Sequence, residues 1–129
     1  MPINITEFDI NTKDEELQAD YTRDFLIACY SHSRVSGFIM WGFWQQDHWK
    51  PDAAMFRADW SEKPNAKVRR DLVADKWRTR LDLTTNAQGE VAGRGHLGAY
   101  AIIVTTGGNS LKHMMQLTRD KAEIRLTLK

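Results

Sequence analysis

The chain has 129 residues, 42% apolar and 27% charged, with a formal net charge of +1. This length suits one ordinary domain with a buried core, and the composition excludes the disordered and collagen-like classes. A nearly neutral charge argues against nucleic-acid binding, and no apolar run approaches the roughly 20 residues of a membrane span. No charged-then-apolar leader opens the chain, so we expect no signal peptide in it. The single cysteine, Cys29, excludes an intramolecular disulfide.

Aromatic residues are unevenly distributed along the chain. All five Trp and all five Phe residues lie before residue 78, and Tyr100 is the only aromatic residue after it. The sequence therefore predicts two segments of different construction, residues 1–82 and residues 83–129.

The first segment shows the pattern of a strand, a helix, a second strand and a second helix. Residues 3–10 alternate like a strand, and residues 14–32 carry apolar side chains at helical spacing, with Thr12 as the expected N-cap. Residues 38–44 form an apolar run typical of a strand buried on both faces. After a polar, irregular stretch, residues 64–79 again show helical spacing. The pattern predicts a βαβ unit followed by a helix.

Two carboxylates and several tryptophans are the candidate functional residues of this segment. Glu7 and Asp9 end an otherwise apolar strand, either as site residues or as solvated charges at a strand end. Trp41, Trp44 and Trp49 lie at or after the end of the next strand. They form either part of the core or a stacking surface, because the apolar face of a sugar ring packs well on an indole.

Short motifs in this segment resemble glycoside hydrolase family 10, the retaining endo-β-1,4-xylanases. The resemblance covers about residues 3–80, and Trp49 follows Trp41 by the eight residues that separate the two active-site tryptophans of that family. The motifs, in the family's order and separations, are ITEFDI at residues 5–10, GFIMWG at 37–42, HWKPDAAMF at 48–56 and KPNAKV at 63–68.

The resemblance implies a role for each candidate residue. Glu7 would be the catalytic nucleophile, working with a second carboxyl group about 5 to 5.5 Å away that acts first as acid and then as base. Asp9 would orient the polar network of the site. Trp41 and Trp49 would wall the sugar subsite nearest the scissile bond, and Lys50 stands where the family often has a basic side chain. The resemblance implies no cofactor and no metal.

The resemblance also implies an α/β fold, a partial (β/α)8 TIM barrel. Residues 1–82 would form the last two β/α units of a barrel that takes about 250 residues when complete. The family's acid/base glutamate lies on strand 4, which we do not find, so we expect the isolated chain to be inactive. Its partners would be the N-terminal remainder of the barrel and xylan or a xylo-oligosaccharide, with no nucleic acid and no membrane. The full-length parent would be secreted or periplasmic.

The second segment has the pattern of a small antiparallel β appendage, of a kind that follows the barrel in some members of the family. Residues 99–105, 111–117 and 122–128 are strand-like, with glycine-containing turns between them. Residues 93–98 match the dinucleotide fingerprint G-x-G-x-x-G, but a strand-like run follows where that motif needs a helix. A structural role against the barrel is favoured, since Tyr100 alone offers little stacking surface.

A second hypothesis comes from a different functional class. The chain would be a non-catalytic carbohydrate-binding or interaction module that keeps Trp41 and Trp49 as a sugar platform. Retention on xylan without turnover would distinguish it from an enzyme.

Overall fold

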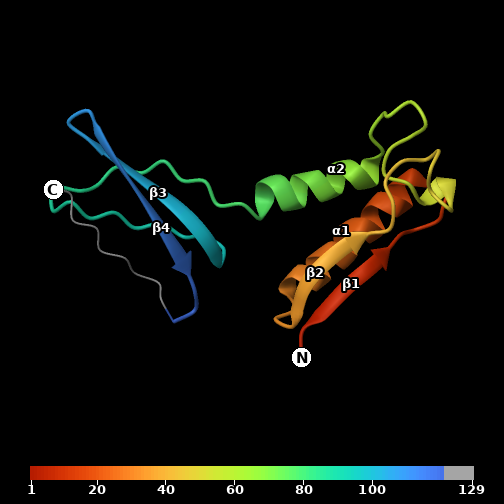
Figure 1. Ribbon diagram of the computed structural model, residues 1–129, viewed down its shortest axis with the longest axis horizontal. Helices are drawn as coiled ribbons and strands as arrows, with labels where there is room; N and C mark the ends of the chain where they lie inside the picture. Colours follow the sequence, from red (N-terminus) through yellow and green to blue (C-terminus); the bar gives the residue numbers. More distant parts are fainter. Residues whose placement is uncertain (121–129) are drawn as a thin grey trace. The chain divides into compact units, whose positions relative to one another are not determined.

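The computed structural model describes residues 1–120 and divides the chain into two compact units, Met1–Arg78 and Thr79–Lys129 (Figure 1). The first unit contains a pair of strands, two helices, a short 3-10 turn and a π-helical segment. In chain order these are β1 Ile3–Phe8, α1 Glu15–Ser31, β2 Val35–Met40, the 3-10 turn Pro51–Ala53, α2 Pro64–Arg70 and the π-helical segment Asp71–Lys76. No helix among the described residues is long and apolar enough to cross a membrane.

Strands β1 and β2 pair in parallel, which confirms the predicted βαβ unit. The ladder aligns Ile5 with Phe38, and it ends where the Trp41 N–H donates to the Phe8 carbonyl at 2.8 Å. The second strand occupies residues 35–40 rather than the predicted 38–44. The reason is Gly42, whose φ of +72° turns the chain away from the sheet.

Helix α1 covers one face of the β1–β2 pair through a cluster of aromatic rings (Figure 1). Phe8 is buried, with its ring 4.9 Å from that of Phe25 on α1 and 5.1 Å from that of Phe38 on β2. Nothing in residues 1–78 covers the opposite face in the same way, since Ile3 is 43% and Ile39 is 58% exposed. The expectation that the second strand is buried on both faces is therefore wrong for the described part of the chain.

The N-termini of the two helices of the first unit are stabilised in different ways. The Asp14 carboxylate caps α1 by accepting the Leu17 N–H at 3.0 Å, whereas the predicted cap, Thr12, accepts the Asp14 N–H at 3.1 Å. The expected N-cap was thus two residues too early. Helix α2 begins at Pro64, where a missing N–H costs no hydrogen bond.

Helix α2 packs beside α1 and then changes its winding. Ala19 and Thr22 of α1 and Ala66 of α2 are all buried, and these small side chains allow the two helices a close approach. The chain continues as a π-helical segment that ends at Lys76, three residues before the predicted end. Trp77 then stacks on Tyr30 of α1, with ring centroids 4.0 Å apart.

The second unit contains an antiparallel hairpin of β3 (Gly98–Thr106) and β4 (Asn109–Leu117). The two strands confirm the predicted strands at residues 99–105 and 111–117. Gly107 and Gly108 connect them with φ values of +54° and +83°, the two-residue turn that fits the twist of a hairpin. The third predicted strand, residues 122–128, lies outside the described residues.

The glycines of the G-x-G-x-x-G match have a packing explanation. Gly98 opens strand β3, so no helix follows the motif. A Cβ added at Gly93 would lie 2.7 Å from Leu81 Cδ1, and one at Gly95 would collide with the Tyr100 hydroxyl. These close approaches account for Gly93 and Gly95 without a bound nucleotide.

Truncation of Phe8 should destabilise the first unit more than truncation of an apolar residue on the open face. We expect Phe8→Ala to lower the free energy of unfolding by roughly 3 to 5 kcal/mol, because it leaves a cavity among packed rings. Ile39→Ala, at a residue 58% exposed, should cost less than about 1 kcal/mol. Urea unfolding followed by tryptophan fluorescence measures both, and equal losses would contradict a core on the α1 side.

Candidate active site

Carboxylates and tryptophans gather at the C-terminal ends of the two parallel strands. Glu7 is the last but one residue of β1, Asp9 follows that strand directly, and Trp41 follows β2. The hydrogen bond from the Trp41 N–H to the Phe8 carbonyl places Trp41 beside this end of β1. The carboxyl ends of parallel strands are where β/α proteins build their sites.

Asp9, Trp49 and Lys50 are in direct contact. The Trp49 indole N–H donates to Asp9 Oδ2 at 3.1 Å, across forty residues of sequence. The Lys50 Nζ lies 4.6 Å from the centroid of the Trp49 ring, within cation–π distance. Trp49 is nevertheless 67% exposed, so the hydrogen bond and the ammonium hold an indole that still presents most of its surface to solvent.

His48 joins the two tryptophan-bearing segments, and the sequence analysis did not identify it as a site residue. Its ring is buried, with Nε2 against the Trp41 carbonyl and Nδ1 accepting the Lys50 N–H at 3.0 Å. Because Nδ1 accepts, the ring proton must sit on Nε2 and be donated to Trp41. A histidine adjacent to Trp49 in a polar loop was the available signal, but the sequence alone did not show its partners.

Glu7 stands apart from this network. Its side chain is exposed, and no hydrogen bond from residues 1–120 reaches its carboxylate. Its position is set by β1, since Phe8 next to it is buried against α1 and successive side chains of a strand point to opposite faces. Trp44 is also outside the network, because its indole N–H donates to the Ala58 carbonyl at 3.3 Å.

Buried polar side chains fix the loop that follows Lys50. Gln18 and Lys63 both donate to the Asp52 carbonyl, at 2.9 and 2.8 Å. Gln18 also donates to the Ile10 carbonyl at 2.7 Å, which links the loop after β1 to the loop after β2. Burial lowers the pKa of Lys63, and the nearby Glu15 carboxylate opposes this shift.

An ion pair attaches the far part of the same loop to the start of α1. The Arg57 guanidinium binds Glu15 through two nitrogens, with Nε 3.2 Å from Oε1 and the second contact to Oε2. It also donates to the Glu62 carbonyl at 2.9 Å. Over residues 1–120, no group of three or more His, Cys, Asp or Glu side chains is placed to hold a metal ion.

A parallel β/α unit whose candidate residues lie at the C-terminal ends of its strands has them where β/α barrel proteins build their sites. Comparison with known families makes this specific. The model of glycosyl hydrolase family 10 matches residues 1–71, so the chain belongs to that family. Membership makes the first unit a segment of a TIM-barrel domain.

Similar curated proteins include xylanases and an anti-sigma-I factor. An anti-sigma-I factor of Acetivibrio thermocellus is 33% identical over 98% of this chain and 17% of its own length. Endo-1,4-beta-xylanases 2 and 3 of Arabidopsis thaliana are 26% and 29% identical over 94% and 86% of this chain, and 11% and 15% of their own lengths. The chain thus spans less than a fifth of these relatives. Their matches are longer than the first unit and include residues of the second.

Gly42 should be intolerant of a side chain because of its contact with His48. A Cβ at this position would lie 2.6 Å from His48 Cδ2, in addition to the strain of a positive φ. We expect Gly42→Ala to lower the free energy of unfolding by about 2 to 4 kcal/mol, as strain and overpacking combine. In a His48→Ala background the ring that the new Cβ would meet is gone and only the backbone strain remains. Gly42→Ala should then lower the free energy of unfolding by only about 1 kcal/mol. Equal costs in the two backgrounds, measured by urea unfolding, would contradict the contact.

Lys63 should make stability depend on alkaline pH. Its pKa is lowered in the folded state, so the unfolded chain binds more protons between that pKa and the ordinary value of 10.5. Stability should therefore rise as pH increases through this window. Lys63→Met removes the titration and should flatten the slope, whatever its effect on absolute stability. Urea midpoints measured across the window test this, and an unchanged slope would refute it.

Proposed function

We propose that this segment contributes the nucleophile side of the active site of a retaining endo-1,4-β-xylanase, with Glu7 as the nucleophile. The observation that carries the proposal is the gathering of Glu7, Asp9, Trp41 and Trp49 at the C-terminal ends of β1 and β2. Membership in family 10 and the xylanase relatives support it.

The proposed chemistry uses Glu7 as a carboxylate. Its oxygen attacks the anomeric carbon as the glycosidic bond breaks, and a second carboxyl group protonates the departing sugar oxygen. Water then hydrolyses the glycosyl-enzyme ester, with the second group now taking the proton of the water. Asp9 has a different role in this proposal, because its Oδ2 accepts the Trp49 indole N–H and so orients that ring.

The aromatic residues bind the substrate in this proposal. Trp49 and Trp41 offer apolar faces to xylose rings, and Lys50 donates to sugar hydroxyls from its place over Trp49. His48 fixes the position of Trp41 relative to Trp49 and Lys50, because its ring hydrogen-bonds to the Trp41 carbonyl and to the Lys50 N–H.

The second carboxyl group is proposed to come from other strands of the barrel. The open face of the β1–β2 pair carries the exposed Ile3 and Ile39, and parallel sheets normally have both faces covered. Further strands would cover this face and complete the site. We therefore propose that residues 1–129 alone do not turn over xylan.

A non-catalytic carbohydrate-binding or interaction module is the second candidate, and one observation favours it. The relative with 33% identity is named as an anti-sigma-I factor and not as a xylanase. In this reading Trp41 and Trp49 bind the polysaccharide, and Glu7 makes no covalent bond.

Covalent trapping tests the nucleophile. The full-length protein incubated with a 2-fluoro-xylobioside should gain one glycosyl label, and peptide mass spectrometry should place it on Glu7. The fluorine slows both the formation and the hydrolysis of the glycosyl-enzyme ester. A reagent with an activated leaving group restores the rate of formation, so the ester accumulates. Label on another residue would contradict the assignment to Glu7.

Binding measured separately from turnover distinguishes the two candidates. Glu7→Gln should abolish hydrolysis of xylan by the full-length protein and leave its retardation in xylan-containing gels unchanged, because the indoles remain. Trp49→Ala should weaken that retardation. A wild-type protein that is retarded but never hydrolyses xylan would favour the non-catalytic module. One that is neither retarded nor able to hydrolyse xylan would argue against both candidates.

A further inference from the structure

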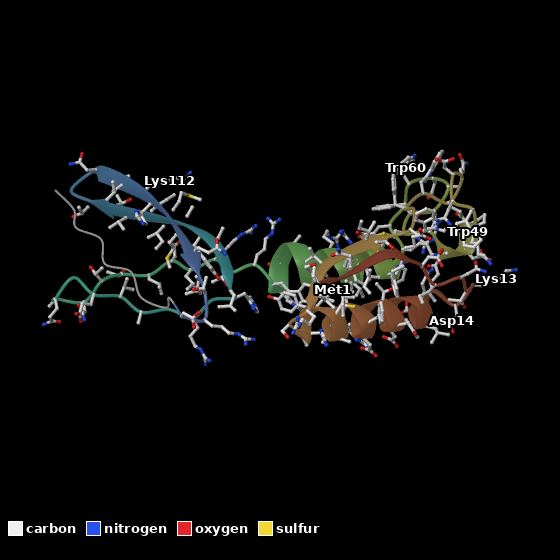
Figure 2. All side chains as sticks on the ribbon, turned by 60° about the horizontal axis from the view of Figure 1, so that its bottom comes forward. Met1, Lys13, Asp14, Trp49, Trp60 and Lys112 are labelled. Atoms are coloured by element: carbon white, nitrogen blue, oxygen red, sulfur yellow. The ribbon has the colours of Figure 1, made fainter. Side chains whose placement is uncertain are left out.

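A second group of aromatic rings lies in the loops of the first unit, outside the Trp41 and Trp49 site. We call Phe43, Trp44, Phe56 and Trp60 the Trp60 cluster. The indoles of Trp44 and Trp60 stack with centroids 4.8 Å apart and planes 10° apart. Phe43 and Phe56 flank Trp60 at 6.0 and 6.3 Å. Trp60 is 55% exposed even so, and Figure 2 shows it on the loops at the same end of the unit as Trp49.

The backbone at Trp60 is in an unfavourable conformation for a residue with a side chain. Its φ is +66°, the one positive φ at a non-glycine position in residues 1–120. Such a conformation costs on the order of 1 kcal/mol or more and persists where surrounding structure imposes it. Here the frame is the Trp60 N–H donating to the Arg57 carbonyl and the Arg57 N–H donating to Ser61, both at 2.9 Å. Arg57 is in turn fixed by Glu15.

We propose that the Trp60 cluster is a second carbohydrate-binding platform, which stacks a pyranose ring of a xylan chain outside the site at the strand ends. The ligand class rests on the proposed function. A rigid, half-exposed indole backed by a second indole offers a flat apolar surface at little cost in side-chain entropy. Phe43 and Trp44 follow Trp41 by two and three residues, so the platform is continuous in sequence with the first sugar site.

Polar groups at the edge of the cluster fit a sugar better than an apolar partner. Gln45 uses Oε1 to accept the Ala58 N–H at 3.0 Å, and none of residues 1–120 accepts from its side-chain NH2 group. That group is therefore available to donate to a hydroxyl. Asp59 is exposed and accepts the Ser61 N–H, and the hydrogen bonds from Ser61 lower the pKa of its carboxyl. A carboxylate at the rim can accept from further hydroxyls.

The test uses a substitution that suits the backbone and removes the ring. Trp60→Gly places glycine at a positive φ, so the loop should keep its course. In the full-length protein carrying Glu7→Gln, we expect this change to weaken binding to insoluble xylan roughly 3- to 10-fold, the range of one aromatic stacking contact. Trp60→Phe keeps a ring at the same place and should restore most of the affinity. The thermal unfolding midpoint checks the fold of each variant.

Turnover of a short aryl xylobioside, measured with Glu7 intact, separates the platform from the site at the strand ends. It should be unchanged in Trp60→Gly, because this substrate does not extend to the platform. Xylan affinity equal to wild type would overturn the platform and leave the proposed function standing. If Trp60→Gly lowers xylan affinity and aryl xylobioside turnover equally, Trp60 has a structural role and the platform is overturned. If xylan affinity is unchanged but self-association in sedimentation is lost, the cluster is instead a contact with a second copy of the chain. Failure of labelling at Glu7 would contradict the proposed function, whereas a loss of xylan binding in Trp60→Gly would still stand as evidence for the platform.

Discussion

The burial of Phe8 against α1 is the constraint on which the arrangement of the first unit depends. Side chains alternate along a strand, so a Phe8 ring packed on Phe25 directs Glu7 to the opposite face. The same residue provides the carbonyl that receives the Trp41 N–H, which ties the end of β2 to the end of β1. One buried ring and one backbone hydrogen bond thus bring the carboxylate of one strand and the indole after the other to a common edge of the sheet.

Backbone carbonyls, more than side-chain pairs, organise the loops above that edge. Asp52 O receives both Gln18 and Lys63, and Trp41 O receives His48. A carbonyl with two lone pairs can satisfy two buried donors, so a fully buried glutamine and a buried lysine are accommodated at one point. The buried Oε1 of Gln18 has no partner among the described residues, so this junction carries the desolvation cost of one unsatisfied acceptor.

Periodicity in the sequence predicted the elements because each has one face buried against a neighbour. The alternation around Phe8 carries that information directly. Along α1 the apolar spacing predicted the helix but only part of its buried face, since Leu17 is 55% exposed while Leu26 and Cys29 are buried. The end of β2 was placed too late because Phe43 and Trp44 continue an apolar run past Gly42, and a hydrophobic pattern does not register a turn made by a positive φ. His48 was missed for a related reason, since its partners are backbone atoms that a sequence does not position. The roles of Glu7 and its neighbours came from the family resemblance and remain proposals.

The two tryptophan sites differ in how they are held, and the difference bears on what each can do. Trp49 is fixed at its rim, by Asp9 on the indole N–H, while Lys50 occupies one of its faces. Trp60 is fixed through a face, by Trp44, within a loop frame that imposes its backbone angle. An indole fixed at the rim with a cation over it is restricted in both orientation and charge, which suits a sugar that must be placed beside a carboxylate. An indole stacked on another ring has a preferred orientation but no ammonium over its face. This suits a sugar that needs only to be bound and not to be placed beside a carboxylate. In the two proposals the same residue type therefore serves two different binding roles, according to the contacts that support it.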